Sequence, residues 1–143
     1  MTIRIAVTDA DITACGPVMR ELRPHVPETE FLARVRTQET SGYRLVMVEE
    51  GGEVVAVAGI RVGENLAWGR FLYVDDLVTL PAARSRGYGA ALLTWLKGYA
   101  AEQGCGQLHL DSGLQREAAH RFYEREGVAR TGYHFVAPIP GGE

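Results

Sequence analysis

The strongest chemical signal in the sequence lies in residues 73–93, where a predicted strand meets a predicted helix. Arg84 and Arg86 stand there beside Gly87 and Gly89. Glycine lets the backbone approach a ligand closely, while arginine side chains and the free N–H groups of a helix start attract phosphate oxygens. The spacing therefore indicates a pyrophosphate site. Taken alone, a Gly-x-Gly pair more often marks a tight turn with solvated arginines.

Other phosphate and nucleophile motifs are absent from the sequence. A dinucleotide-binding loop requires a third glycine where this chain has Leu92, and neither Gly-Lys-Ser/Thr nor Gly-x-Ser-x-Gly occurs. Cys105 has no histidine nearby in sequence, which disfavours a covalent acyl-cysteine route. The two cysteines and four histidines lack ligand spacing, so we expect no metal site.

Length and charge narrow the class of protein. The chain has 143 residues, with 15 Lys+Arg, 18 Asp+Glu and a net charge of −3. Without a linker or repeat, this length predicts a single domain over residues 1–143. The weak negative charge argues against a nucleic-acid partner. The longest apolar run, Val54–Ala58, is too short to span a membrane, and the N-terminus lacks a secretory signal. We therefore expect a cytoplasmic protein without a membrane partner.

Hydrophobic periodicity and turn residues predict the element order β-α-α-β-β-β-α-β-α-β. The predicted strands are Thr2–Val7, Tyr43–Glu49, Glu53–Val62, Trp68 or Gly69 to Leu80, Gln107–Asp111 and Thr131–Ala137. The predicted helices run from a cap at Asp9 or Asp11 to Leu22, around Phe31–Val35, over Gly87–Glu102 and over Arg116–Glu126. Pro17 predicts a kink in the first helix or its division into two pieces. A strand meander followed by strand–helix alternation indicates a mixed α/β layer.

Two motifs carry a family resemblance. The run Arg84–Gly89 fits Arg/Gln-x-x-Gly-x-Gly/Ala at each fixed position, and Ala119–Gly127 fits a late-helix pattern. In these motifs and in element order, the sequence resembles the GCN5-related N-acetyltransferases, the GNAT family. The resemblance implies an α/β fold of the α+β type, a single GNAT-like domain. Its mixed, mostly antiparallel central sheet would have about four flanking helices and a splayed strand before the CoA-binding helix.

The resemblance also implies a cosubstrate and a reaction. Acetyl-CoA would bind here, and its acetyl group would move to a primary amine of a small molecule or peptide. The backbone N–H of Val78, or of a neighbour, would hold the thioester carbonyl oxygen. The residues implied in acetyl-CoA binding are Leu77, Val78, Thr79, Arg84, Ser85, Arg86, Gly87, Tyr88, Gly89 and Ala90.

Three residues are candidates for proton transfer. The resemblance implies that Tyr123 is the general acid for the leaving thiolate, whereas its pattern alone favours a core aromatic. Asp75 and Asp76 are neighbours on a strand, so we expect their side chains on opposite faces. Either carboxylate could take the amine proton or hold a cationic substrate, and a purely structural role is the alternative. Asp76 is preferred because it is nearer to the thioester segment.

Further residues are candidates for the acceptor side. Aromatic strand residues either line the acceptor pocket or belong to the core. They are Tyr43, Trp68 and Tyr73. The segment Leu22–His25 falls where such folds border the acceptor site, and His25 is predicted to be a surface loop residue more than a substrate contact. His120, three residues before Tyr123, either tunes the tyrosine or lies on the surface.

The charges around the strand end suggest two ligands. Asp75 and Asp76 precede it and Arg84 and Arg86 follow it, which suits a phosphate-bearing donor and a cationic acceptor. A non-catalytic acyl-CoA-binding sensor or interaction module is the alternative function, and a longer-chain acyltransferase is a third. The strand Thr131–Ala137 is a candidate for pairing across a homodimer. The sequence selects neither the amine acceptor, the base, the acyl chain nor the oligomeric state.

Overall fold

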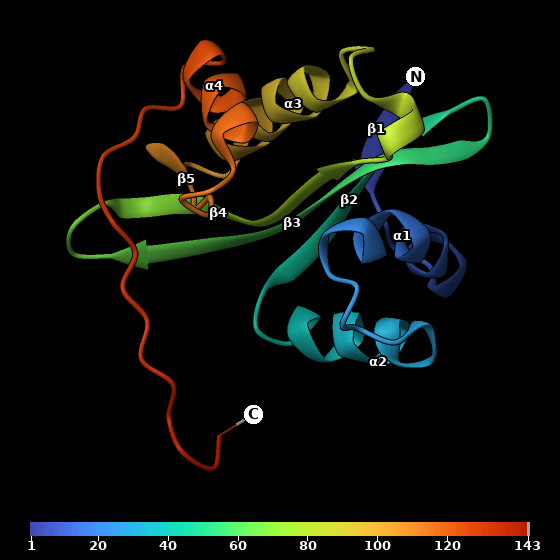
Figure 1. The fold of residues 1–143 in the computed structure, drawn as a ribbon, viewed down its shortest axis with the longest axis horizontal. Helices are drawn as coiled ribbons and strands as arrows, with labels where there is room; N and C mark the ends of the chain where they lie inside the picture. The colour runs from blue at the N-terminus through green and yellow to red at the C-terminus, as the bar shows by residue number, and fades with distance from the viewer. Residues whose placement is uncertain (143) are drawn as a thin grey trace. The chain divides into compact units, whose positions relative to one another are not determined.

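The computed structural model describes residues 1–142, and the chain divides into two compact units, Met1–Leu110 and Asp111–Glu143 (Figure 1). The first unit contains the sheet, three of the α-helices and a short 3-10 helix, η1, at Pro81–Ala83. The second contains one helix followed by a segment without regular structure. The prediction of one domain over residues 1–143 stays a prediction.

The first unit is built on a five-stranded sheet in the order β1-β2-β3-β4-β5. The first four strands are antiparallel neighbours, and β5 pairs parallel to β4. The strands are β1 Thr2–Ile5, β2 Tyr43–Glu50, β3 Glu53–Asn65, β4 Gly69–Thr79 and β5 Gln107–Leu110. The predicted mixed, mostly antiparallel sheet is therefore confirmed.

Helices cover both faces of this sheet. The helices α1 (Asp9–Leu22) and α2 (Glu28–Glu39) pack on one face, and α3 (Tyr88–Glu102) packs on the other (Figure 1). Successive residues of a strand point to opposite faces, so neighbouring residues of β2 enter different cores. Leu45 lies in the core under α1 and α2, whereas Val46 lies in the core under α3.

The first helix is continuous through Pro17, so the expected division into two pieces is wrong. The residue before a proline normally resists helical geometry because its Cβ meets the proline ring, but that residue is Gly16. Buried Ile12 and Val18 hold the helix on the sheet on either side of the proline. The helix is capped by Thr8, whose hydroxyl accepts a hydrogen bond from the Asp11 N–H at 3.1 Å, and not by an aspartate.

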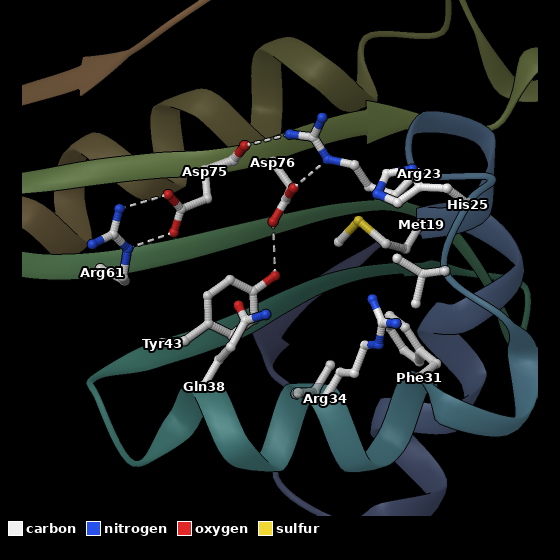
Figure 2. A pocket seen from close by; sticks show the side chains of 12 residues that line it. Met19, Arg23, His25, Phe31, Arg34, Gln38, Tyr43, Arg61, Asp75 and Asp76 are labelled. Carbon is white, nitrogen blue, oxygen red and sulfur yellow. Dashed lines mark hydrogen bonds and ion pairs between the residues drawn. The ribbon is translucent and has the colours of Figure 1, made fainter. Parts of the chain in front are cut away.

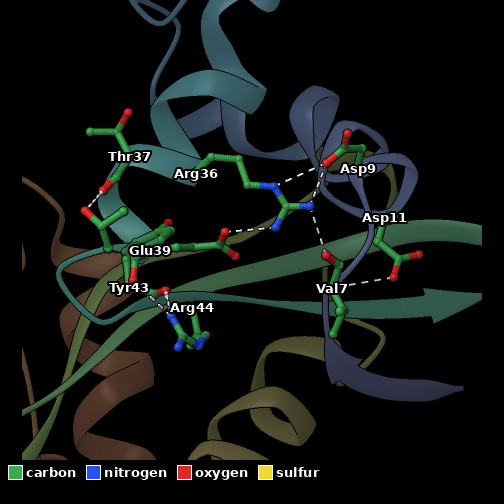
Figure 3. A network of polar contacts seen from close by, with 9 residues as sticks. Val7, Asp9, Asp11, Arg36, Thr37, Glu39, Tyr43 and Arg44 are labelled. Atoms are coloured by element: carbon green, nitrogen blue, oxygen red, sulfur yellow. Dashed lines mark hydrogen bonds and ion pairs between the residues drawn. The ribbon is translucent and has the colours of Figure 1, made fainter.

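A polar network fixes α2 against the start of α1 (Figure 3). The Arg36 guanidinium on α2 donates to Asp9 Oδ1 at 2.6 Å, to the Val7 carbonyl at 3.0 Å and to Glu39 Oε1 at 2.9 Å. The network lies at the end of the helices that is remote in sequence from the loop of residues 23–27. It therefore fixes the two helices without occupying that loop.

The strands β4 and β5 separate part-way along their length. Their pairing ends at Val74 and Leu110, and β4 continues alone to Thr79. Beyond Val74, β4 has a neighbour only on its β3 side within residues 1–142. This open edge is the splayed strand that the sequence predicts before the CoA-binding helix.

The second unit contains α4, Glu117–Arg125. The helix ends at Arg125, and Gly127 just beyond its cap has φ +83°, with the Val128 N–H donating to the Tyr123 carbonyl at 2.8 Å. The predicted strand Thr131–Ala137 is wrong, because these residues form no strand. Alternating apolar residues make a strand only where a neighbouring backbone accepts their hydrogen bonds, and Phe135 is 90% exposed here. No helix in the described part of the chain is long and apolar enough to cross a membrane.

Candidate active site

The loop after β4 has backbone geometry that suits an anion. Ser85 and Gly87 both have positive φ, at 64° and 83°, and Gly87 caps the start of α3. The first helical hydrogen bond runs from the Ala91 N–H to the Gly87 carbonyl. The N–H groups of residues 88–90 have no backbone or side-chain acceptor within residues 1–142. They are donors of the kind that hold phosphate oxygens at helix starts.

Arg84 and Arg86 are exposed beside these donors. Neither guanidinium has an ion pair with another described residue. Free guanidinium groups next to unpaired helical N–H groups fit the pyrophosphate of a CoA molecule. Binding of acetyl-CoA by the loop of residues 84–90 stays a prediction.

The open edge of β4 presents specific backbone groups. Leu80 donates to the Val55 carbonyl at 2.9 Å, and the same register pairs Val78 with Val57. Hydrogen-bonded residues alternate along an antiparallel strand, so Val78 faces β3 and its neighbours face the open edge. Leu77 and Thr79 therefore turn their N–H and C=O groups to the open edge, where the resemblance predicts a pantetheine arm. The sequence left open whether the N–H of Val78 or that of a neighbouring residue holds the thioester oxygen. The N–H of Val78 faces β3, so only its neighbours, Leu77 and Thr79, have an N–H group at the open edge.

A β-bulge at Asp75 brings both carboxylates to one face of the sheet. Ile60 pairs with Val74 and Gly59 pairs with Asp76, which leaves Asp75 as the extra residue on β4. A bulge interrupts the alternation of side chains. The expectation that Asp75 and Asp76 point to opposite faces is therefore wrong, and both line one cavity on the face that carries α1 and α2.

Asp76 is held by two donors. The Tyr43 hydroxyl donates to its Oδ2 at 2.9 Å, and Arg23 Nε donates to its Oδ1 at 2.8 Å. Gly59 makes the space, because a Cβ atom there would collide with the Tyr43 hydroxyl and the Asp76 carboxylate. Burial first, and then the charge of Asp76, raise the pKa of Tyr43 well above its usual range. Tyr43 therefore stays a protonated donor.

Asp75 is held by one arginine. Arg61 Nε and Nη2 donate to its two carboxylate oxygens at 2.7 and 2.8 Å, a bidentate pair. The Arg61 guanidinium also lies 5.5 Å from the centre of the Tyr73 ring. Each carboxylate of the bulge is thus matched by its own arginine.

The two carboxylates lie at one wall of a cavity of about 470 Å³ in the first unit (Figure 2). Its remaining walls come from α1, the loop of residues 23–27, α2, β2 and β3. The lining residues are Met19, Arg23, His25, Val26, Phe31, Arg34, Val35, Gln38, Tyr43, Arg61, Asp75 and Asp76. A cavity of this size accommodates a small molecule.

Of the three aromatic residues considered for the acceptor pocket, one lines the cavity. Tyr43 lines it, whereas Trp68 and Tyr73 do not. Trp68 stacks on His109 with ring centres 3.5 Å apart. His25 lies in a loop, as predicted, and it also lines the cavity.

Residues 11–128 match the model of the acetyltransferase (GNAT) family. The chain belongs to this GNAT family. An uncharacterized N-acetyltransferase of Bacillus subtilis, YhdJ, is 34% identical over 125 residues, which cover 86% of this chain and 88% of the relative. The aminoalkylphosphonate N-acetyltransferase of Salmonella typhimurium is 32% identical over 98 residues, 68% of this chain and 62% of the relative.

The fold of this GNAT protein is also that of solved acetyltransferases. The aminoglycoside N-acetyltransferase AAC(6')-Iy in complex with CoA superposes with a TM-score of 0.85 at 13% identity, over 97% of this chain and 95% of that chain. The GNAT fold predicted from the sequence is confirmed, and the protein is an acyltransferase.

The candidate acid of the GNAT protein lies in the second unit. Tyr123 is a buried residue of α4, and burial raises the pKa of its phenol, partly opposed by Arg116. A phenol that stays protonated at neutral pH retains a proton to donate. The role of Tyr123 as general acid stays a prediction. His120 is half-buried, and its Nε2 lies 2.8 Å from the Gly113 carbonyl.

The thiols of the GNAT protein are poorly suited to catalysis. Cys15 is buried, which raises the pKa of its thiol to about 12. Cys105 is half-buried and free. No group of metal-ligating side chains is found among the described residues.

Several residues of the cavity were missed by sequence reasoning. Arg34 and Gln38 look like surface residues of a helix, and Arg61 like an outward residue of a strand. Only Arg23 had a signal, because it falls in the segment expected to border the acceptor site. The bulge that gathers these residues around two aspartates has no sequence marker apart from Gly59 opposite it.

Proposed function

We propose that the protein transfers the acetyl group of acetyl-CoA to a primary amine of a small molecule or peptide, by direct attack of the amine on the thioester. One observation carries the proposal. In one strand end, residues 75–79 of β4, the first two residues place carboxylates in a cavity and the last residues have an open backbone edge. The chain then passes through the short 3-10 helix Pro81–Ala83 into the loop of residues 84–90. Donor and acceptor would thus meet along one strand.

The protein groups have separate tasks in this reaction. When bound, acetyl-CoA supplies an activated acyl carbon. The N–H of Leu77 or Thr79 would hold the carbonyl oxygen as negative charge develops on it. Asp75 and Asp76 would attract the ammonium form of the acceptor and take the proton that the amine loses, directly or through water.

The reaction is completed when the sulfur of CoA leaves and takes up a proton. The new C–N bond forms as the C–S bond breaks, and Tyr123 would donate its phenolic proton to the leaving thiolate. No enzyme nucleophile is needed. The alternative function, an acyl-CoA-binding sensor or interaction module, has the same anion-binding loop and lacks turnover.

Related proteins support the reaction class. The names of relatives specify an aminoalkylphosphonate N-acetyltransferase and a streptothricin acetyltransferase, and a protein of the same fold is an aminoglycoside N-acetyltransferase. Amines are common to these activities. A cytoplasmic location, the lack of nucleic-acid and membrane partners, and a homodimer stay predictions from the sequence.

The test is release of free CoA thiol from acetyl-CoA in the presence of a panel of primary amines, with the acetylated product identified by mass. We expect thiol release that depends on the amine. Tyr123→Phe should lower kcat more than it changes KM. A protein that binds acetyl-CoA in a calorimeter and releases no thiol with any amine is a sensor. Undiminished turnover of the Tyr123→Phe variant removes the tyrosine as the acid.

A further inference from the structure

The cavity beside β4 is lined by more arginines than aspartates. Its charged lining consists of Arg23, Arg34 and Arg61 against Asp75 and Asp76. From this lining we infer that the acceptor amine also carries a compact anionic group, a carboxylate, phosphate or phosphonate, which binds Arg34, while the spare donors of Arg23 and Arg61 add positive charge to the cavity. The inference rests on the proposed function, because it names the class of acceptor for the same site.

The two aspartates are already compensated within the protein. Arg23 pairs with Asp76 at 2.8 Å, and Arg61 pairs with Asp75 at 2.7 Å. A polycation entering the cavity would therefore meet no carboxylate without a positive partner. The cationic acceptor expected from the acidic pair in the sequence does not fit this charge balance. An acceptor that places one ammonium group beside the aspartates and one anion beside Arg34 fits this charge balance.

Arg34 supplies the positive charge that no cavity aspartate balances. It extends from α2 into the cavity, on the wall opposite β4 (Figure 2). Its one ion pair among the described residues is with Glu30, at 3.1 Å, a residue of the same helix that is not part of the cavity lining. The two side chains are 48% and 53% exposed, so water and salt weaken this pair. An anion in the cavity can compete with Glu30 for Arg34.

The other two arginines are held in place with donors to spare. Arg23 uses Nε on Asp76 and Nη2 on the Asp75 carbonyl, and Arg61 uses Nε and Nη2 on Asp75. Nη1 of each has no hydrogen-bond partner in the structure of residues 1–142. A guanidinium already fixed by a carboxylate loses little conformational freedom when it binds a ligand.

The apolar part of the lining fits a short carbon chain between the two charges. Met19 of α1 and Phe31 and Val35 of α2 line the cavity with apolar side chains. They offer contact to methylene groups and no charge. The amine would then face Asp75 and Asp76, and the anion would face Arg34.

A matched series of acceptors tests this orientation on the full-length protein. The compounds β-alanine, β-alaninamide and 1,3-diaminopropane place a carboxylate, a neutral amide and an ammonium group at similar distances from the reacting amine. A fourth compound, 2-aminoethylphosphonate, replaces the carboxylate by a phosphonate. We expect kcat/KM for the two anionic amines to exceed that for the amide and the diamine by about tenfold or more.

Two variants locate the preference. Arg34→Gln should bring the ratio of kcat/KM between β-alanine and β-alaninamide close to one, mainly through a higher KM for β-alanine. Arg44→Gln is the matched control, because Arg44 is exposed on β2, outside the cavity lining, and donates only to backbone carbonyls. It should leave the ratio as in the wild-type protein.

The outcomes separate this inference from the proposed function. Turnover of β-alaninamide or 1,3-diaminopropane equal to that of the anionic amines overturns the inference and leaves the acetyltransferase standing. If no amine releases thiol, the proposed activity fails. Calorimetric titration of 2-aminoethylphosphonate and ethylamine then decides about the cavity. Tighter binding of the phosphonate that is lost in Arg34→Gln supports an anion site, and equal or absent binding of both compounds overturns it.

Discussion

The hydrogen bond from Tyr43 helps to hold the Asp76 carboxylate at the cavity wall, and removing it should lower the stability of the fold measurably. Tyr43 is 3% exposed, and the Asp76 side chain is 13% exposed. Tyr43→Phe keeps the ring and deletes only the hydroxyl that donates at 2.9 Å. Asp76 then retains Arg23 alone, and part of a buried carboxylate loses its donor.

The expected cost follows from the charge of the acceptor. A hydrogen bond to a charged group contributes about 1.5–3 kcal/mol to stability. For a chain of 143 residues, an unfolding entropy of about 2.1 cal/mol/K per residue converts this into a fall in Tm of about 5–10 °C. Because the pKa of Tyr43 is raised in the folded protein, its hydroxyl stays protonated, and the cost should be constant between about pH 6 and pH 9.

Urea unfolding and calorimetry of Tyr43→Phe provide the assay. Tyr99→Phe is the control, because Tyr99 is half-buried and its hydroxyl has no hydrogen bond among the described residues. The control should change stability by less than about 0.5 kcal/mol. In an Asp76→Ala background, Tyr43→Phe should also cost less than about 0.5 kcal/mol, since its partner is gone. A loss below that value in the wild-type background, or an equal loss in both backgrounds, would refute the reasoning.

Three further predictions concern the glycines and one histidine. Gly59→Ala should destabilise the fold by about 1–3 kcal/mol in urea, because its Cβ would collide with the Tyr43 hydroxyl and the Asp76 carboxylate. Gly87→Asp should lower the affinity for acetyl-CoA by about tenfold or more in calorimetry, because it puts a strained, negatively charged residue at the N–H groups proposed to bind phosphate. Burial lowers the pKa of His109, so its contribution to stability should be present above about pH 6.5 and be lost as pH falls through the folded pKa. His109→Asn should therefore reduce the fall in Tm between pH 7.5 and pH 5.

Matched variants keep these predictions specific. Gly98 lies on α3 with no other atom within 4 Å of an added Cβ, so Gly98→Ala should be neutral or stabilising, and Gly98→Asp should bind acetyl-CoA normally. Equal effects at Gly98 and at Gly59 or Gly87 would contradict the assigned contacts. An unchanged pH profile in His109→Asn would contradict the role of that ring.

Local patterns determined most of the fold. The hairpin from Tyr43 to Asn65 and the helix after Gly87 follow from alternation, turn residues and a 3.6-residue period, which depend on neighbours in sequence. The same local signal was misleading at Thr131–Ala137, because alternation records what a strand could bury and not whether a neighbouring strand is present.

The sequence by itself determined the family and the backbone geometry of the loop proposed to bind an anion, because glycines, arginines and a helix start act through a few consecutive residues. Tertiary structure decided the acceptor cavity. One extra residue in β4 turned Asp75 and Asp76 to the same face, and segments distant in sequence, the loop after α1 and the helix α2, brought Arg23 and Arg34 to the same cavity. Charge balance in a cavity depends on which side chains meet across the fold. A linear pattern that shows only two adjacent aspartates therefore indicates a cation, whereas the folded site is suited to an amine that carries an anion.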